Sequence, residues 1–131
     1  MRYLLIVFVL FLSACDDGAT VRHYDKNLQK LSCLRLSIFP PDKLLSETLQ
    51  SLYSFTPTCI YTLQASRKGG IVCNSNQNAP KKALSNFPSA FVRLDIYEGK
   101  KPLYSYYKDL SSPADKSDIR SGFLRLKEDT L

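Results

Sequence analysis

An apolar run of nine residues, Leu4–Leu12 (LLIVFVLFL), follows the positively charged Arg2 at the N-terminus and divides the chain into two unequal parts. A helix needs about 20 apolar residues to cross the hydrocarbon core of a bilayer, so this run is too short to span a membrane. A short apolar run behind a positive charge is typical of an export signal, which is removed from the mature protein. Its removal leaves about 115 of the 131 residues, enough for a single hydrophobic core.

The apolar run ends in Leu12-Ser13-Ala14-Cys15. The small residues at 13 and 14 give a peptidase access to the bond before Cys15, and only a thiol can accept a diacylglycerol. The four residues resemble the lipobox of bacterial lipoproteins, a resemblance that covers residues 1–17. It implies that residues 1–14 are a signal peptide and that Cys15 carries a diacylglycerol thioether and an N-linked acyl chain such as palmitate. Several acyl chains make membrane attachment stable. The alternative is an ordinary secretory signal with a cysteine at its cleavage site.

Two acidic residues, Asp16 and Asp17, follow the cysteine. An aspartate directly after the lipidated cysteine resembles the sorting signal that retains lipoproteins of enteric bacteria in the inner membrane. We therefore expect a protein that is anchored by lipid to the periplasmic face of the inner membrane.

Three further cysteines, Cys33, Cys59 and Cys73, lie beyond the lipobox. An exported protein meets oxidising conditions, so we expect one disulfide and one remaining thiol, which could form a mixed disulfide with a partner. All three pairings are possible from the sequence, and we favour Cys59–Cys73 or Cys33–Cys73. The spacing does not resemble the Cys-x-x-Cys pattern of redox-active pairs.

The hydrophobic pattern predicts one domain over residues 33–131, preceded by the lipidated cysteine and a tether over residues 15–32. Tyr24, Leu28 and Leu31 have helical spacing, so the tether could include a short docking helix. Alternating apolar residues predict a strand over residues 33–39. The apolar positions of residues 42–55 lie near one face of a predicted helix, for which Pro41 could serve as the first residue.

Two hairpins and a closing helix are predicted after residue 58. The first hairpin runs from Cys59 to Cys73 around a three-residue loop, Arg67-Lys68-Gly69, and a loop or short helix follows from Pro80. The second hairpin turns at Gly99-Lys100, and a helix that includes Ile119, Phe123 and Leu126 closes the chain. The expected fold class is α+β: a small antiparallel sheet of about five strands, in two hairpins plus one, covered by two or three helices.

The second hairpin suggests an interaction surface. A simple register with a two-residue turn pairs Ile96 with Leu103, and it places four partner-binding candidates on the opposite face of the strands: Arg93, Tyr97, Tyr104 and Tyr106. Tyrosine and arginine on an open sheet face are favoured at protein interfaces. The alternative is that a helix covers this face and that the tyrosines belong to the core.

Composition narrows the classes of function. The net charge is +6, or +5 once Arg2 is removed, which suits an acidic protein, an anionic lipid surface or a wall-associated polymer. Nucleic acid is not an expected partner of an exported chain. The single histidine, His23, lies in the predicted tether, so we expect no catalytic triad, metal site or cofactor. We expect a non-catalytic protein-binding or assembly module of the cell envelope. The alternative is a lipoprotein that binds a small molecule or inhibits an enzyme.

Overall fold

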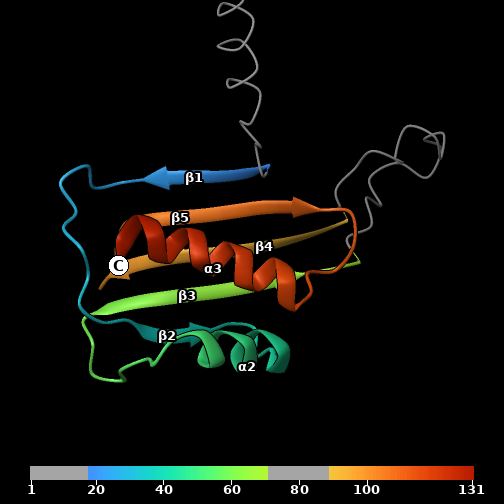
Figure 1. Ribbon diagram of the computed structural model, residues 1–131, viewed down its shortest axis with the longest axis horizontal. Coiled ribbons are helices and arrows are strands. Elements are labelled where there is room, and N and C mark those ends of the chain that lie inside the picture. Colours follow the sequence, from blue (N-terminus) through green and yellow to red (C-terminus); the bar gives the residue numbers. More distant parts are fainter. Residues whose placement is uncertain (1–17, 71–88) are drawn as a thin grey trace, which may run out of the picture.

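The computed structural model describes residues 18–70 and 89–131, which form one five-stranded sheet with two helices (Figure 1). The elements are β1 (Ala19–His23), β2 (Arg35–Ile38), α2 (Lys43–Leu52), β3 (Tyr61–Lys68), β4 (Ala90–Glu98), β5 (Lys101–Leu110) and α3 (Lys116–Thr130). The strand order is β1-β5-β4-β3-β2. The expected α+β class with a helix-covered sheet is confirmed, as are the strand near residues 35–38, the helix after Asp42 and the closing helix.

The sheet is mixed, where an antiparallel one was expected. β2 and β3 are parallel because α2 connects them as a crossover, and the other neighbours are antiparallel. The predicted first hairpin is wrong, because β3 pairs with β2 on one side and with β4 on the other. Arg67 and Lys68 belong to β3 and lie opposite Val92 and Phe91. The expected return strand near Cys73 and the expected turn from Pro80 lie outside the described residues.

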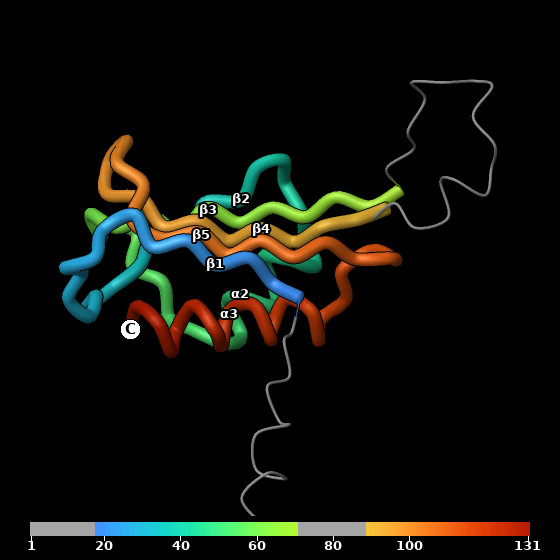
Figure 2. The backbone as a smooth tube through the Cα atoms, turned by 90° about the horizontal axis from the view of Figure 1, so that it is seen from above, coloured from blue at the N-terminus to red at the C-terminus, as the bar shows by residue number. Residues whose placement is uncertain are grey.

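Both helices lie on the same face of the sheet, as Figure 2 shows in a view of the sheet from its edge. Alternate residues of the central strands point into this layer. They include Leu63, Val92, Leu94 and Ile96, all fully buried. Phe123 of α3 completes the core and lies 5.9 Å from the ring of Tyr53 and 6.2 Å from that of Phe55.

The start of α2 is tied to the sheet by its capping residue. Asp42 is the N-cap and accepts a hydrogen bond from the Leu45 N–H (3.1 Å), so Pro41 precedes the helix and is not its first residue. Arg67 of β3 makes an ion pair with Asp42 and also donates to the Ala114 carbonyl (2.9 Å). Burial alone would raise the pKa of Asp42, but the hydrogen bonds from Arg67 and from the Leu45 backbone outweigh it and lower that pKa. One arginine therefore joins β3, α2 and the segment before α3.

The segment predicted as a tether belongs to the domain. Residues 19–23 form the edge strand β1, which pairs with β5, and no helix includes Tyr24 or Leu28. The Leu31 side chain is buried, and its N–H donates to the Thr130 carbonyl at the end of α3 (2.8 Å). The folded part of the described chain thus begins at β1 and not at residue 33.

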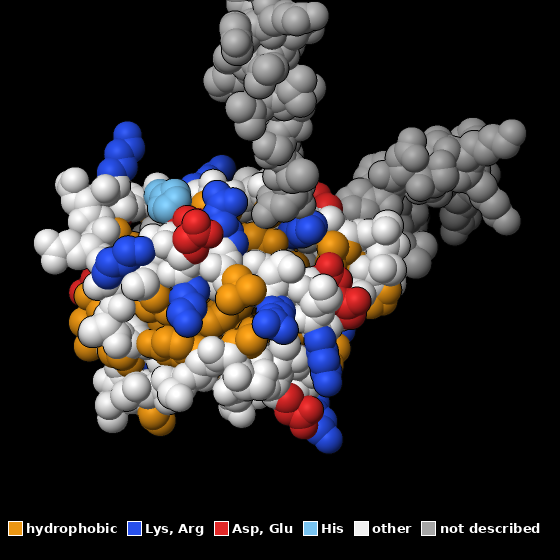
Figure 3. All heavy atoms as spheres, viewed as in Figure 1, with side chains coloured by type: hydrophobic (Ala, Val, Ile, Leu, Met, Phe, Trp, Pro, Cys, Tyr) orange, Lys and Arg blue, Asp and Glu red, His pale blue; other side chains and the backbone are white. Residues whose placement is uncertain are grey.

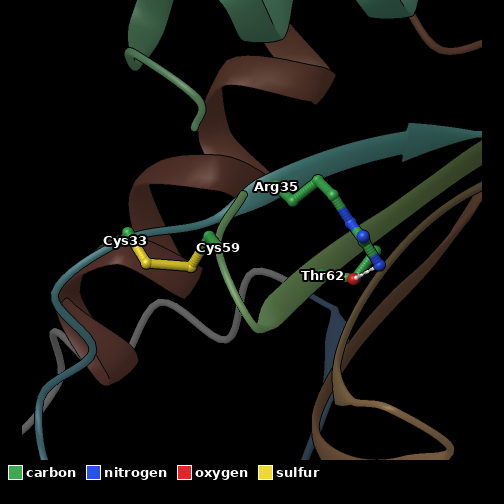
Figure 4. Close-up of a disulfide and its surroundings, with 4 residues drawn as sticks. All are labelled: Cys33, Arg35, Cys59 and Thr62. Atoms are coloured by element: carbon green, nitrogen blue, oxygen red, sulfur yellow. Dashed lines mark hydrogen bonds between the residues drawn. A yellow bond between two sulfur atoms is a disulfide. The ribbon is translucent and has the colours of Figure 1, made fainter. Parts of the chain in front are cut away.

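The disulfide joins Cys33 to Cys59, with a Cα–Cα distance of 6.0 Å (Figure 4). The favoured pairings with Cys73 are not the one formed, and Cys73 lies outside the described residues. The parallel pairing of β2 and β3 explains the result, because the two cysteines precede strands that begin at the same end of the sheet. Beside the disulfide, Arg35 donates to the Thr62 hydroxyl (2.8 Å) across these two strands (Figure 4).

Candidate functional site

The two faces of the sheet differ. The described helices cover one face and leave the other open (Figure 2). Alternation along the strands places polar, basic and aromatic residues on the open face. They are Thr20 and Arg22 of β1; Ser105, Tyr107 and Asp109 of β5; Phe91, Arg93, Asp95 and Tyr97 of β4; Thr62, Gln64, Ser66 and Lys68 of β3; and Arg35 and Ser37 of β2.

The expected face of the second hairpin is correct for β4 and wrong for β5. The turn at Gly99-Lys100 is confirmed, but an irregularity between Ile96 and Tyr97 shifts the register by one residue, so Ile96 lies opposite Tyr104 and not Leu103. A shift of one residue moves every following side chain to the other face. Arg93 and Tyr97 therefore lie on the open face, whereas Tyr104 and Tyr106 lie under α3.

The two tyrosines under α3 belong to the core. Tyr104 is fully buried and Tyr106 is 1% exposed. The Tyr104 hydroxyl donates to Asp129 Oδ2 (2.8 Å), and burial, followed by this hydrogen bond, raises the pKa of Tyr104. Gly122 of α3 lets the helix approach Tyr106, because a Cβ at that position would come within 2.8 Å of the tyrosine ring. The alternative interpretation, that these tyrosines are core residues, is the one that holds.

A hollow of about 220 Å³ crosses β1, β5 and β4 on the open face, and we call it the two-arginine groove. Its lining residues are Thr20, Arg22, Tyr24, Arg93, Ser105 and Tyr107. Two guanidinium groups and four hydroxyl groups make it a surface suited to carboxylates or other oxyanions.

The arginines of the two-arginine groove are held differently. Arg93 Nε contacts Asp95 Oδ2 at 2.7 Å, and the Arg93 side chain is 48% exposed. Asp95 is buried, and its Oδ1 has no hydrogen-bond partner in the part of the chain described. Arg22 makes no ion pair with a described residue, and its guanidinium carbon lies 5.9 Å from the centre of the Tyr24 ring. Arg93 is thus positioned by a carboxylate, whereas Arg22 is available to a ligand.

Tyr107 of β5 lines the groove and lies opposite Arg93 of β4. Its hydroxyl donates to Asp109 Oδ1 (2.7 Å), and this hydrogen bond raises the pKa of Tyr107. Its ring stacks on Phe91 of β4, with centroids 5.5 Å apart and planes at 28°. The stacked pair is a rigid aromatic surface that loses little conformational entropy when a partner binds.

A second hollow of about 420 Å³ lies on the β2 side of the same face. It is lined by Arg35, Thr62, Gln64, Tyr97, Gly99 and Lys100. Basic residues therefore occur at both sides of the open face. Positive and negative side chains are interspersed over the outer surface of the helix-covered side (Figure 3).

Within residues 18–70 and 89–131, no three His, Cys, Asp or Glu side chains lie close enough to hold a metal ion. The His23 ring makes an edge contact with Tyr104, with centroids 5.2 Å apart.

The lipidation and sorting candidates Cys15, Asp16 and Asp17 lie outside the described residues. None of the helices in the described ranges is long and apolar enough to cross a bilayer.

Three lining residues of the two-arginine groove, Arg22, Tyr24 and Tyr107, are not among the partner-binding residues expected from the sequence. Arg22 and Tyr24 were assigned to a tether, although the alternation of Ala19 and Val21 with polar residues is a strand pattern. The simple register of the second hairpin pairs Tyr107 with Val92 on the covered face, whereas in the structure Tyr107 lies opposite Arg93 on the open face. Comparison with protein-family models, with curated proteins and with solved structures found no match to this chain.

Proposed function

We propose that this protein is a lipid-anchored envelope protein that binds an acidic partner protein through the open face of its sheet, without catalysing a reaction. The observation that carries the proposal is the two-arginine groove, because Arg22 and Arg93 line it together with Tyr24 and Tyr107 on a face that no described helix covers. Arginine and tyrosine are the residues that contribute most to binding at protein interfaces.

The anchor is supported by the N-terminal sequence and by the disulfide. The run from Leu4 to Cys15 resembles a lipoprotein signal, and Asp16 resembles an inner-membrane sorting signal. The Cys33–Cys59 disulfide suits an oxidising compartment such as the periplasm. Only Asp16 and Asp17 separate Cys15 from Gly18, and the three Cα–Cα steps between Cys15 and Gly18 can span at most about 11 Å when fully extended. A lipid on Cys15 would therefore hold β1 close to the membrane surface.

The charge of the open face favours an acidic partner. Its central acid, Asp95, is already paired with Arg93, and Asp109 accepts the Tyr107 hydrogen bond. The basic groups Arg22 and Lys68 have no ion-pair partner among the described residues. A carboxylate that reaches Arg22 would gain a charge-assisted, bidentate hydrogen bond. Complementary charge would also speed the encounter of the two proteins.

Site-specific photo-crosslinking in living cells tests the proposal. A photoreactive residue at Tyr107 should give an adduct with an envelope protein, whereas one at Leu124, which is 48% exposed on the outer surface of α3, should give none. Arg22→Glu should weaken the adduct because it places a negative charge in the groove. Arg120→Glu makes the same charge change on exposed α3 and is the matched control.

Two outcomes would contradict the proposal. An adduct from Leu124 but not from Tyr107 would place the partner on the helices. An adduct from Tyr107 that is equally strong with Arg22→Glu would show that the arginine does not recognise the partner. If the protein instead binds a small molecule, the photoreactive residue at Tyr107 should give no protein adduct. If it inhibits an enzyme, that enzyme should be the only protein in the adduct.

A further inference from the structure

The edge strand β1 borders the two-arginine groove and ends the described sheet on that side (Figure 1). An edge strand presents backbone N–H and C=O groups that can pair with another strand. Native sheets usually protect such edges with proline, lysine or a bulge. The sequence of β1, Ala19–His23 (ATVRH), contains neither proline nor lysine, and its register with β5 is regular.

The opposite edge of the sheet is protected. β2 has four residues, Arg35–Ile38, and Pro40 and Pro41 follow it directly. Proline cannot donate a backbone hydrogen bond and interrupts strand pairing. The Leu34 carbonyl, just before β2, already accepts a hydrogen bond from the Thr56 N–H (2.8 Å). Of the two edges, β1 is therefore the one that could accept a further strand.

The direction of the outward backbone groups follows from one hydrogen bond. The Tyr24 N–H donates to the Leu103 carbonyl (3.0 Å), so the backbone of Tyr24 faces β5. In an antiparallel pair, residues that face the partner strand alternate with residues that face away from it. The backbone groups of Val21 and His23 therefore face away from β5, toward the free side of β1.

We propose that the partner presents an extended acidic segment that adds to the free edge of β1 as a sixth strand. This inference rests on the proposed binding function and specifies how the partner is held. Backbone hydrogen bonds to Val21 and His23 would supply affinity, and alternate side chains of the added strand would supply specificity. The side chain beside Arg22 would lie on the open face, where a glutamate or aspartate can pair with the guanidinium.

Charge decides between an acidic partner and a second copy of this chain. The net charge of the chain is +6, and the edge carries Arg22 with no ion pair to any described residue. Two copies joined through β1 would bring these positive groups together, whereas an acidic segment would neutralise them.

Hydrogen exchange of the full-length lipidated protein, purified in detergent, tests the inference with synthetic peptides. The probe is a ten-residue peptide of alternating Glu and Thr, and the control probes are a Lys-Thr peptide and a Glu-Thr peptide with alternate backbone nitrogens methylated. We expect the Glu-Thr peptide to slow exchange of the Val21 and His23 amides. The two control peptides should not slow it, because one has the wrong charge and the other lacks backbone donors.

A pair of variants separates backbone pairing from side-chain contact. His23→Pro removes an outward N–H without removing a hydrogen bond to β5. In this variant the Glu-Thr peptide should no longer slow exchange of the Val21 amide. His23→Ala removes the ring but keeps the N–H, and it should preserve the protection. Equal protection by the Lys-Thr peptide, retained protection in His23→Pro, or no protection by the Glu-Thr peptide would each overturn the inference. Protection that rises with protein concentration in the absence of peptide would assign the edge to a second copy and would also overturn it.

The outcome is distinguishable from a failure of the proposed function. If Arg22→Glu weakens the adduct at Tyr107 in cells while Val21 and His23 stay unprotected, then binding to the open face stands and strand addition is wrong. If Arg22→Glu leaves the adduct unchanged, then the proposed function itself is wrong.

Discussion

Removal of the Cys33–Cys59 disulfide should destabilise the domain substantially. The bond closes a loop of 26 residues. The loop-closure entropy for that length is about 12 cal/mol/K, or about 3.5 kcal/mol at 25 °C. A domain of this size has a free energy of unfolding of about 5–15 kcal/mol, so the disulfide contributes a large fraction of it.

Urea unfolding of the double variant Cys33→Ser/Cys59→Ser measures the effect. The chain contains no tryptophan, so circular dichroism or tyrosine emission can follow unfolding. With a urea dependence of about 1–3 kcal/mol/M, the midpoint should fall by about 1.2–3.5 M. Cys73→Ser is the matched control and should leave the midpoint unchanged. A loss below about 1 kcal/mol in the double variant, or an equal loss in Cys73→Ser, would refute the reasoning.

Three further predictions concern the packing of the helices. Arg67→Ala should cost about 2 kcal/mol at pH 7, measured by urea unfolding. Because the folded-state pKa of Asp42 is lowered, its stabilisation is present above the ordinary value of 3.8 and is lost as the pH falls below it, so this variant should also flatten the acid limb of the stability profile. If the acid limb of the stability profile were the same in Arg67→Ala as in the unmodified protein, the ion pair between Arg67 and Asp42 would be disproved. Gly122→Ala should lower the free energy of unfolding by about 1–3 kcal/mol, measured by calorimetry, because the added Cβ meets the Tyr106 ring. This loss should exceed the gain of about 1 kcal/mol that alanine brings through its higher helix propensity. A stabilised variant would show that α3 packs less closely against the sheet. Tyr104→Phe should cost about 1 kcal/mol, since it removes one hydrogen bond and keeps the ring, and a cost near zero would disprove that bond.

Local patterns predicted the helices well and the pairing of strands less well. The apolar spacing of residues 42–55 located α2, although the sequence suggested Pro41 and not the Asp42 cap as its start, and Ile119 with Phe123 located α3. The pairing of β3 with β2 and β4 depends on residues far apart in sequence, and the nearby Gly69 suggested a local turn instead. Long-range pairing of this kind leaves little trace in a local hydrophobic pattern.

The candidate surface was predicted in part. Arg93 and Tyr97 were placed correctly because they lie on β4, before the irregularity in the hairpin. One extra residue in the return strand then exchanged the faces of Tyr104 and Tyr107. Both registers bury apolar or aromatic residues, so the pattern alone did not distinguish them.

The compartment of the protein, the oxidation state of its cysteines and the distance of β1 from the membrane all depend on how the N-terminus is processed. Mass spectrometry of the N-terminal fragment, isolated from membranes of the native bacterium, tests this directly. We predict a fragment that begins at Cys15 and carries a diacylglyceryl group and an additional acyl chain. A fragment that retains Met1, or one with an unmodified thiol at Cys15, would contradict the lipid anchor.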